Sequence, residues 1–294
     1  MEALTGFLAE LNELKRQSTA LTPSLAGSIF GFAWHRILDG QEVGQAALEV
    51  TARAIASARL GGIDEYSLEQ AGLNVPVILS IFERSFDAVS APIETVLRNR
   101  LRGSLSNPRP APVQPLAPFI LNLIGQPRAG ATRPGRARIV MLPAESHADH
   151  CAMVALYSVL LAPRFGSDIA QPFLAALIHH AHNAWLPDAG FTGEEMLGDY
   201  LNEAIAALRR KALSQLPVQL RERTQTALES ISLIDTPEAR TFHAADVLDR
   251  VLQMRWYEQA ARFTLKFALD DMELVHAGPV QSFHREVLRE AGLC

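Results

Sequence analysis

Several features are scarce in this chain of 294 residues. Cysteine occurs only at Cys151 and Cys294, which excludes a disulfide framework. Cys151 lies in an apolar segment, so we expect a reduced core residue there. No cationic, apolar signal peptide follows Met1. The longest apolar run, 152–162, is also too short for a bilayer, which needs about 20 residues. We therefore expect a cytoplasmic protein that does not interact with membranes.

An excess of positive charge is also missing. The formal net charge is -5 at pH 7. Nucleic-acid-binding proteins usually present a basic face, so we expect no nucleic acid polymer as a partner. What the chain does have is apolar residues, which make up 48% of it. Its length and composition allow a sizeable core in one large domain or two ordinary ones.

Helical patterns fill the chain, and no β-alternation of useful length interrupts them. In the first segment, apolar residues recur at the spacing of one buried helical face, namely at Leu4, Phe7, Leu8, Leu11 and Leu14. Further helices are predicted over 29–38, 43–59, 64–72 and 77–100. Asp64 is the predicted N-cap of the short helix over 64–72, and Pro92 predicts a break or kink in the helix over 77–100. The predicted fold class is all-α.

The segment 103–118 is the best domain boundary in the chain. It contains five prolines, and proline fixes φ and lacks the amide donor, which favours a semi-rigid spacer. We predict a helical domain over 1–102 with no assigned role, a linker over 103–118 and a second helical domain over 119–294. Eight of the nine histidines follow residue 146, so we expect the chemistry in the second domain.

The second domain also reads as helices joined by polar segments. Helices are predicted over 119–124, 194–213 and 217–231. Between the first two of these, one helix is predicted to begin at 148 and a second one to end at 178. Thr192 and Thr236 are predicted N-caps, with Pro237 at the first helical position after Thr236. The helix that begins there is expected to continue, bent or broken, to about residue 271, and a short helix over 283–291 ends the chain.

The stretch AALIHHAHNAWLPD, residues 175–188, carries the strongest chemical signal. An apolar run leads into His179 and His180. Burying imidazoles without partners costs free energy, and neutral imidazole is a common metal ligand. Further ligands must come from elsewhere, and His150 and Asp246 are the candidates. Three imidazoles and one carboxylate suit a divalent transition metal such as Mn, Co, Zn, Fe or Ni better than Mg or Ca.

A second pattern precedes the His150 segment. Residues 126–138 are predicted to be a loop, and its arginines have no acid between them: Arg128, Arg133, Arg136 and Arg138. Two interpretations stay open. The loop is either a solvated basic surface or a clamp for phosphate, whose oxygens guanidinium groups bind bidentately.

The order of these motifs resembles a known family. PAESHADHCAMVA, ALIHHAHNAWLPD and EARTFHAADVLDRVLQ are similar to three segments of the HD-domain superfamily of metal-dependent phosphohydrolases, in particular its 5′-deoxynucleotidase-like branch. The similarity covers roughly 119–291. It implies an HD-like helical bundle that hydrolyses a nucleoside monophosphate or a similar small phosphorylated substrate with the help of a metal ion. It also implies a homodimer.

Transferred position by position, the resemblance assigns roles to individual residues. It makes His150, His179 and Asp246 metal ligands, and places His180 where the family has the Asp of its pair. Asn183 stands where the nucleotidases have a Glu that positions or activates water. Asp188 matches an acidic residue near the substrate phosphate, and Arg136 matches the phosphate-binding arginine. Beyond the resemblance, we expect His182 or Asp188 to replace the missing Glu as base, and Arg138 to bind phosphate beside Arg136.

Two other functions compete with hydrolysis. Some superfamily members are di-iron oxygenases with extra histidines, which His147, His182 and His243 would supply. The missing Asp at position 180 counts against this function, because that carboxylate usually bridges the two metals. The other alternative is a non-catalytic nucleotide-binding or regulatory protein with a degenerate pocket.

Overall fold

The computed structural model describes residues 2–20, 22–106, 113–261 and 264–293. Over these residues the regular structure is helical, and β pairing is limited to two isolated bridges, Pro127 with Ser146 and Ala131 with Ile139. The predicted all-α class is confirmed. Within the described ranges, no helix combines the length and the apolar character needed to cross a membrane.

Seven helical elements form the N-terminal part: α1 (Glu2–Asn12), the 3-10 turn η1 (Glu13–Lys15), α2 (Leu25–Leu38), α3 (Val43–Leu60), α4 (Glu65–Gln70), α5 (Val75–Val89) and α6 (Thr95–Ser104). The rest contains α7 (Pro118–Gly125), α8 (His147–Phe165), α9 (Ala170–Ile178), η2 (Ala181–Ala184), α10 (Gly190–Leu197), η3 (Gly198–Tyr200), α11 (Leu201–Leu213), α12 (Val218–Ser230), α13 (Pro237–Ala261), η4 (Phe267–Asp271, a π-helix) and α14 (Gln281–Glu290).

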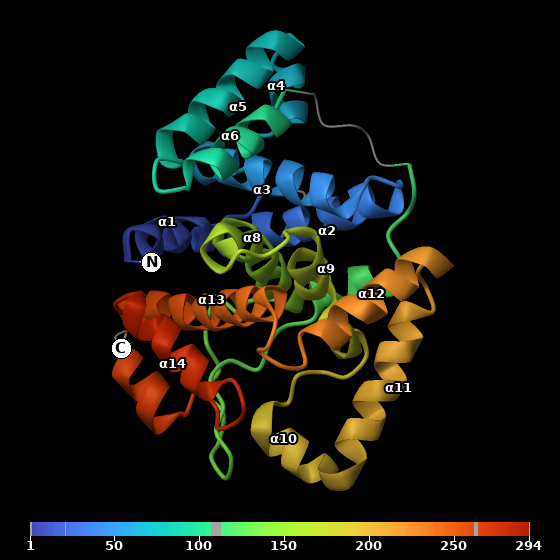
Figure 1. The fold of residues 1–294 in the computed structure, drawn as a ribbon, viewed down its shortest axis with the longest axis vertical. Helices are drawn as coiled ribbons and strands as arrows, with labels where there is room; N and C mark the ends of the chain where they lie inside the picture. The colour runs from blue at the N-terminus through green and yellow to red at the C-terminus, as the bar shows by residue number, and fades with distance from the viewer. Residues whose placement is uncertain (1, 21, 107–112, 262–263, 294) are drawn as a thin grey trace.

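Helix α8 is the centre of the molecule. Every residue from 147 to 162 is buried, as expected for a helix that is apolar on all sides. Figure 1 shows α8 and α9 between α2 and α3 on one side and α13 on the other, and these helices contact one another. The capping box of Ser146 and Asp149 fixes where α8 begins. The first turn of α8, which carries His147 and His150, is therefore firmly placed.

One cluster of buried apolar residues runs through both parts of the chain, from Phe7 to Leu293. Trp34 of α2, for example, packs edge-on against Phe119 of α7, with ring centroids 5.5 Å apart. The predicted domain boundary at 103–118 stays a prediction, and part of it, 107–112, lies outside the described residues. The shared core means that the N-terminal helices cover the central helix directly.

Local signals located several helix ends correctly. Asp64 and Thr236 accept hydrogen bonds from the N–H groups of Ser67 and Ala239, as N-caps do. The chain is also broken near Pro92, between α5 and α6. The predicted cap at Thr192 is wrong because α10 already begins at Gly190, and the Thr192 hydroxyl donates to the carbonyl of Arg136 instead.

Two predicted long helices differ from the structure. The helix predicted over 194–213 is divided at Gly198, whose φ of +51° interrupts the α-helical path. Helix α13 ends at Ala261, and the predicted continuation passes through 262–263, which lie outside the described residues.

Candidate metal centre

His150 lies fully buried in the first turns of α8 and faces two carboxylates of α13. Its Nδ1 is 2.7 Å from Oδ2 of Asp249, and its Nε2 is 3.2 Å from Oδ1 of Asp246. An ionised carboxylate only accepts hydrogen bonds. The short contact with Asp249 therefore assigns the ring proton to Nδ1, which leaves a lone pair on Nε2.

His179 and His180 lie in the turn between α9 and η2. Nδ1 of His179 donates to the carbonyl of Ala176 at 2.7 Å, and Nδ1 of His180 donates to Oδ1 of Asn183 at 2.9 Å. The Asn183 amide is oriented by its other end, because its Nδ2 donates to the carbonyl of Leu186. Both rings therefore carry their proton on Nδ1 and an unprotonated Nε2.

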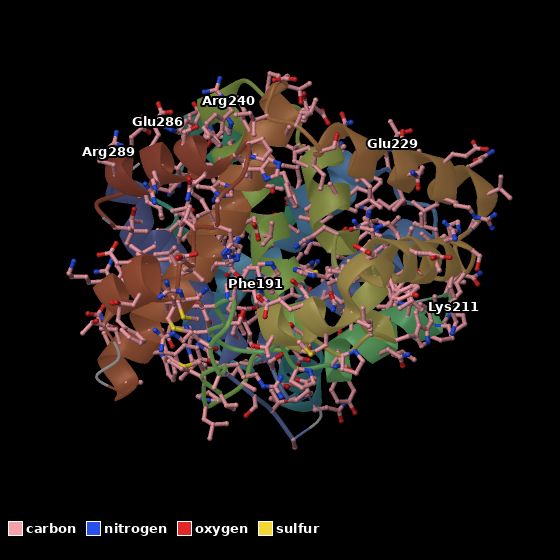
Figure 2. All side chains as sticks on the ribbon, turned by 90° about the horizontal axis from the view of Figure 1, so that it is seen from below. Phe191, Lys211, Glu229, Arg240, Glu286 and Arg289 are labelled. Atoms are coloured by element: carbon pink, nitrogen blue, oxygen red, sulfur yellow. The ribbon has the colours of Figure 1, made fainter. Side chains whose placement is uncertain are left out.

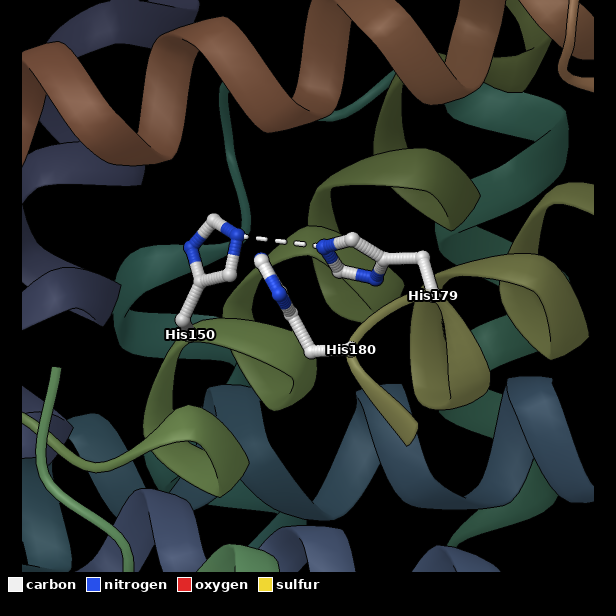
Figure 3. A group of neighbouring side chains, drawn as sticks. All are labelled: His150, His179 and His180. Atoms are coloured by element: carbon white, nitrogen blue, oxygen red, sulfur yellow. Dashed lines mark hydrogen bonds between the residues drawn. The ribbon is translucent and has the colours of Figure 1, made fainter. Parts of the chain in front are cut away.

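These three side chains converge, and we call them the histidine triad (Figure 3). One ligand atom from each of His150, His179 and His180 lies within 4.8 Å of the others. The ring of His150 has its centroid 5.2 Å from each of the other two. At a Zn–N distance of about 2 Å, two imidazoles on one tetrahedral ion have centroids about 5 Å apart. The triad therefore fits a divalent transition metal.

The charge state of the triad also suits a metal ligand. Burial, followed by the neighbouring His150, lowers the pKa of His179 to about 3. Burial and the adjacent His179 likewise hold the pKa of His180 well below its usual range. Both rings are therefore neutral near pH 7, which is the form that binds metals. Nε2 of His150 and Nε2 of His179 are only 3.2 Å apart, and two lone pairs at that distance favour a cation between them.

Asp246 of α13 completes the predicted ligand set. Its Oδ2 pairs with Nη1 of Arg250 at 3.4 Å, and its Oδ1 faces His150. Burial raises the pKa of Asp246, but its contact with His150 and the charge of Arg250 outweigh it and hold that pKa well below its usual range. Arg250 is itself fixed, because Nη2 donates to the carbonyl of Leu274 and to Nε2 of His276. The structure thus places Asp246 beside His150, while among the described residues only the three histidines form a group whose ligand atoms all lie within 4.8 Å of one another.

A cavity of about 450 Å³ opens beside the triad. Its charged wall residues include Arg128, Asp188 and Arg250, and Phe191 and Phe242 supply aromatic surface. Phe191 is labelled near the middle of the face seen in Figure 2. Its ring meets that of His276 edge to face, with centroids 4.4 Å apart. The cavity is large enough for a small organic phosphate beside a metal ion.

The three predicted catalytic residues border this cavity in different ways. Asp188 accepts from the backbone N–H groups of Ala129 and Gly190, at 2.9 Å each, so it ties two loops together. Asn183 holds His180 in place. His182 has a buried Nδ1 with no hydrogen-bond partner among the described residues, and burial, followed by the charge of Arg209, lowers its pKa to about 4.

The predicted phosphate ligands Arg136 and Arg138 lie elsewhere. Both are exposed and neither lines the cavity. Arg138 donates to the backbone carbonyl of Asp188 from outside. Arg128, from the same loop, lines the cavity instead, with its Nη1 bound to Glu145 Oε1 at 2.7 Å. The loop turns back through two isolated bridges, so its start and its end meet near the site while its tip points away.

Sequence reasoning missed Asp249 and Lys15. Asp249 is fully buried and receives hydrogen bonds from His150, Asn12 and Lys15. One signal was available for Asp249, because an acid three residues after Asp246 in an apolar helix shares its face. No local pattern marks Lys15, whose partner Asp249 is 234 residues away in the sequence.

His147 and His243 lie close to the centre without joining the triad. The buried His147 has its ring centroid 4.9 Å from that of His180, and neither ring nitrogen has a hydrogen-bond partner among the described residues. His243 donates from Nε2 to the carbonyl of Ile231. Over the described residues, the triad is the one group of three or more His, Cys, Asp or Glu side chains with metal-binding geometry.

Comparison with known proteins agrees with this geometry. The HD-domain family model matches residues 123–287, which contain the triad and Asp246. No curated protein and no solved structure gave a significant match. The match spans more than half of the chain and includes its metal-binding geometry, so this chain belongs to the HD-domain family.

Proposed function

We propose that this protein is a metal-dependent phosphohydrolase that acts on a nucleoside monophosphate or a similar small phosphomonoester. One observation carries the proposal. All three triad histidines bind an oxygen acceptor through Nδ1, which leaves three Nε2 lone pairs beside the ionised Asp246 at a cavity wall. Such outer hydrogen bonds fix the tautomer and orientation of metal-binding histidines. Membership of the HD-domain family supports the same function.

The donor set suits Mn, Co, Zn, Fe or Ni, with His150, His179, His180 and Asp246 as ligands. When bound, such an ion would polarise a phosphate oxygen and lower the pKa of a bound water. Because His180 stands where the family has an Asp, the site holds one negative charge fewer. A more positive site is compatible with water activation near neutral pH.

The cavity supports a small anionic substrate. Arg128 and Arg250 place two guanidinium groups in its wall, and Phe191 and Phe242 offer flat apolar surface for the remainder of a substrate. We assign phosphate binding to Arg128 in preference to Arg136 and Arg138, because Arg128 lines the cavity and they do not. We assign the role of proton acceptor to His182, which lines the cavity and whose buried Nδ1 has no hydrogen-bond partner among the described residues.

The test is metal analysis of the purified protein together with phosphate release from a panel of phosphomonoesters. We expect about one equivalent of transition metal and phosphate release, with both lost in Asp246→Asn, which keeps the side-chain shape. Arg98→Gln, at a surface ion pair with Asp87, should retain both and serves as the control. Full turnover in Asp246→Asn would refute the proposal. Two equivalents of iron with oxygen consumption would indicate an oxygenase, and nucleotide binding without turnover a regulatory protein.

A further inference from the structure

Lys15 is a buried cation held between two carboxylates. It belongs to η1, outside the part of the chain that matches the family model. Its Nζ lies 2.7 Å from Oε2 of Glu145 and 2.7 Å from Oδ1 of Asp249, and its side chain is 1% exposed. A buried ammonium group is tolerated only when it is paired in this way.

Asp249 connects Lys15 to the candidate metal centre. Oδ1 of Asp249 accepts from Nδ2 of Asn12 at 2.9 Å, and Oδ2 accepts from Nδ1 of His150 at 2.7 Å. Asn12 ends α1 and is itself buried. Two residues of the N-terminal segment therefore bind the carboxylate that orients a predicted metal ligand.

Glu145 connects Lys15 to the wall of the same cavity. Oε1 of Glu145 accepts from Nη1 of Arg128, and Oε2 accepts from Lys15. Burial raises the pKa of Glu145, but the charges of Lys15 and Arg128 outweigh it and hold that pKa well below its usual range. Lys15 thus contacts both the support of the triad and the support of the cavity arginine.

We propose that Lys15 and Asn12 are positioning residues of the metal centre, and that the functional unit therefore begins in α1 rather than at the start of the family match. The inference rests on the proposed function. Without Lys15, Asp249 would lose one of the two N-terminal donors that hold its carboxylate, and an unpaired buried carboxylate is unfavourable. The Asp249 side chain would then shift, and His150 would lose the bond that holds its ring and its tautomer.

A merely structural role would have a different consequence. If Lys15 only attaches η1 to the loop before α8 and to α13, its loss lowers stability whatever residue stands at position 249. If it acts through Asp249, its effect on metal affinity depends on that carboxylate. A double-mutant cycle separates the two roles.

The experiment is titration of the metal-free full-length protein with Co²⁺, followed by its visible absorption. Four proteins form the cycle: the wild type, Lys15→Met, Asp249→Asn and the double variant. We expect Asp249→Asn to weaken Co²⁺ binding by about 10–100-fold and Lys15→Met by about 10-fold. In the Asp249→Asn background, Lys15→Met should cause no further loss. Arg53→Met removes another buried cation that pairs with two carboxylates, Glu49 and Glu65, and should leave the affinity unchanged.

Asn12→Leu keeps the inference testable if Lys15→Met does not fold. It removes one donor to Asp249 and leaves Glu145 untouched, and we expect several-fold weaker Co²⁺ binding. Wild-type affinity in folded Lys15→Met, or in Asn12→Leu when Lys15→Met does not fold, would overturn this inference and leave the proposed function standing. So would an equal loss from Lys15→Met in both backgrounds. If the wild type bound no Co²⁺, the proposed function would fail and this inference with it.

Discussion

At the scale of single residues, the triad shows how a helical site selects one ring nitrogen. Each Nδ1 is bound to an oxygen of a different kind: the carboxylate of Asp249, the backbone of Ala176 and the amide of Asn183. Only the amide acceptor can be removed without leaving a buried charge. Asn183 therefore serves here to orient His180.

We predict that Asn183→Leu weakens Co²⁺ binding by about 10–100-fold, because Nδ1 of His180 loses its acceptor and the ring can turn. The affinity is measured by the same optical titration. Asn122→Leu is a matched control, since Asn122 donates to the carbonyl of Ala184 in η2 and does not touch His180. Wild-type affinity in Asn183→Leu would mean that this bond does not position a ligand.

His284 of α14 gives a pH dependence that does not involve the ligands themselves. It is 5% exposed, and burial lowers its pKa to about 4, against the opposing charge of Asp246. Arg250, His243 and His276 also face it, and each lowers that pKa. Between about pH 6.5 and pH 4 the unfolded chain binds a proton at this position that the folded chain does not. The unfolding free energy therefore decreases as the pH is lowered from about 6.5 to about 4.

The variant His284→Leu should remove this contribution. We expect the wild type to lose about 2 kcal/mol more unfolding free energy than the variant between about pH 7 and about pH 5. Urea unfolding at the two pH values measures the difference. Parallel losses in the two proteins would show that His284 titrates alike in the folded and unfolded states.

Some residues of the site could be predicted from their side-chain chemistry, and others only from the way the helices pack. His150, His179, His180 and Asp246 could be selected from the sequence because few other environments allow so many imidazoles next to apolar helices. Asp249 and Lys15 could not be selected as a pair, since their contact depends on how α1 and α13 pack. Arg128 was one of four loop arginines, and only the path of the loop distinguishes it from Arg136 and Arg138.

At the scale of elements, the segment between α7 and α8 is what brings Arg128 and Glu145 together. Ala131 and Ile139 exchange both backbone hydrogen bonds, which closes the loop. Gly130 precedes this bridge with a φ of +82°, and a Cβ there would overlap the carbonyl oxygen of Ile139. Gly135, at the tip, has a φ of +66° but open space around it.

We therefore predict that Gly130→Ala opens the loop and Gly135→Ala does not. Both variants bear the strain of a positive φ, about 1–2 kcal/mol, but only the first adds a clash with backbone. Trypsin should cleave Gly130→Ala faster at the exposed Arg136 and Arg138, and phosphate release should fall as Arg128 loses its position. Equal cleavage rates in the two variants would contradict this account.

Helix boundaries were predictable where a local residue determines them. Asp64, Thr236 and Pro92 mark ends or breaks that the structure contains. Thr192 was misleading, because its hydroxyl donates a hydrogen bond to the carbonyl of Arg136 and α10 begins two residues earlier, at Gly190. A single glycine such as Gly198 does not by itself exclude a helix, so the sequence did not predict the break there. In the structure, Gly198 has a positive φ and divides the predicted helix.

At the scale of the whole molecule, the N-terminal helices bury one side of α8. The fully buried Tyr157 donates from its hydroxyl to the carbonyl of Leu8, and α2 and α3 contact the same helix. A chain that contained only the predicted second domain would expose this side to water, and exposed apolar surface favours aggregation.

We predict that residues 119–294 expressed alone do not show cooperative unfolding, whereas residues 1–106 and 113–294 expressed together co-purify as a complex. The reason is that the interface between the two parts is core, with Trp34 against Phe119 at its centre. Thermal unfolding followed by circular dichroism, with size-exclusion chromatography of the pair, provides the measurement. Trp34→Ala in the first fragment should weaken the complex, while Arg98→Gln, on an exposed ion pair, should not. Cooperative unfolding of the lone fragment at the temperature of the whole chain would instead favour two independent domains. The contacts of Lys15 and Asn12 would then connect separate folding units.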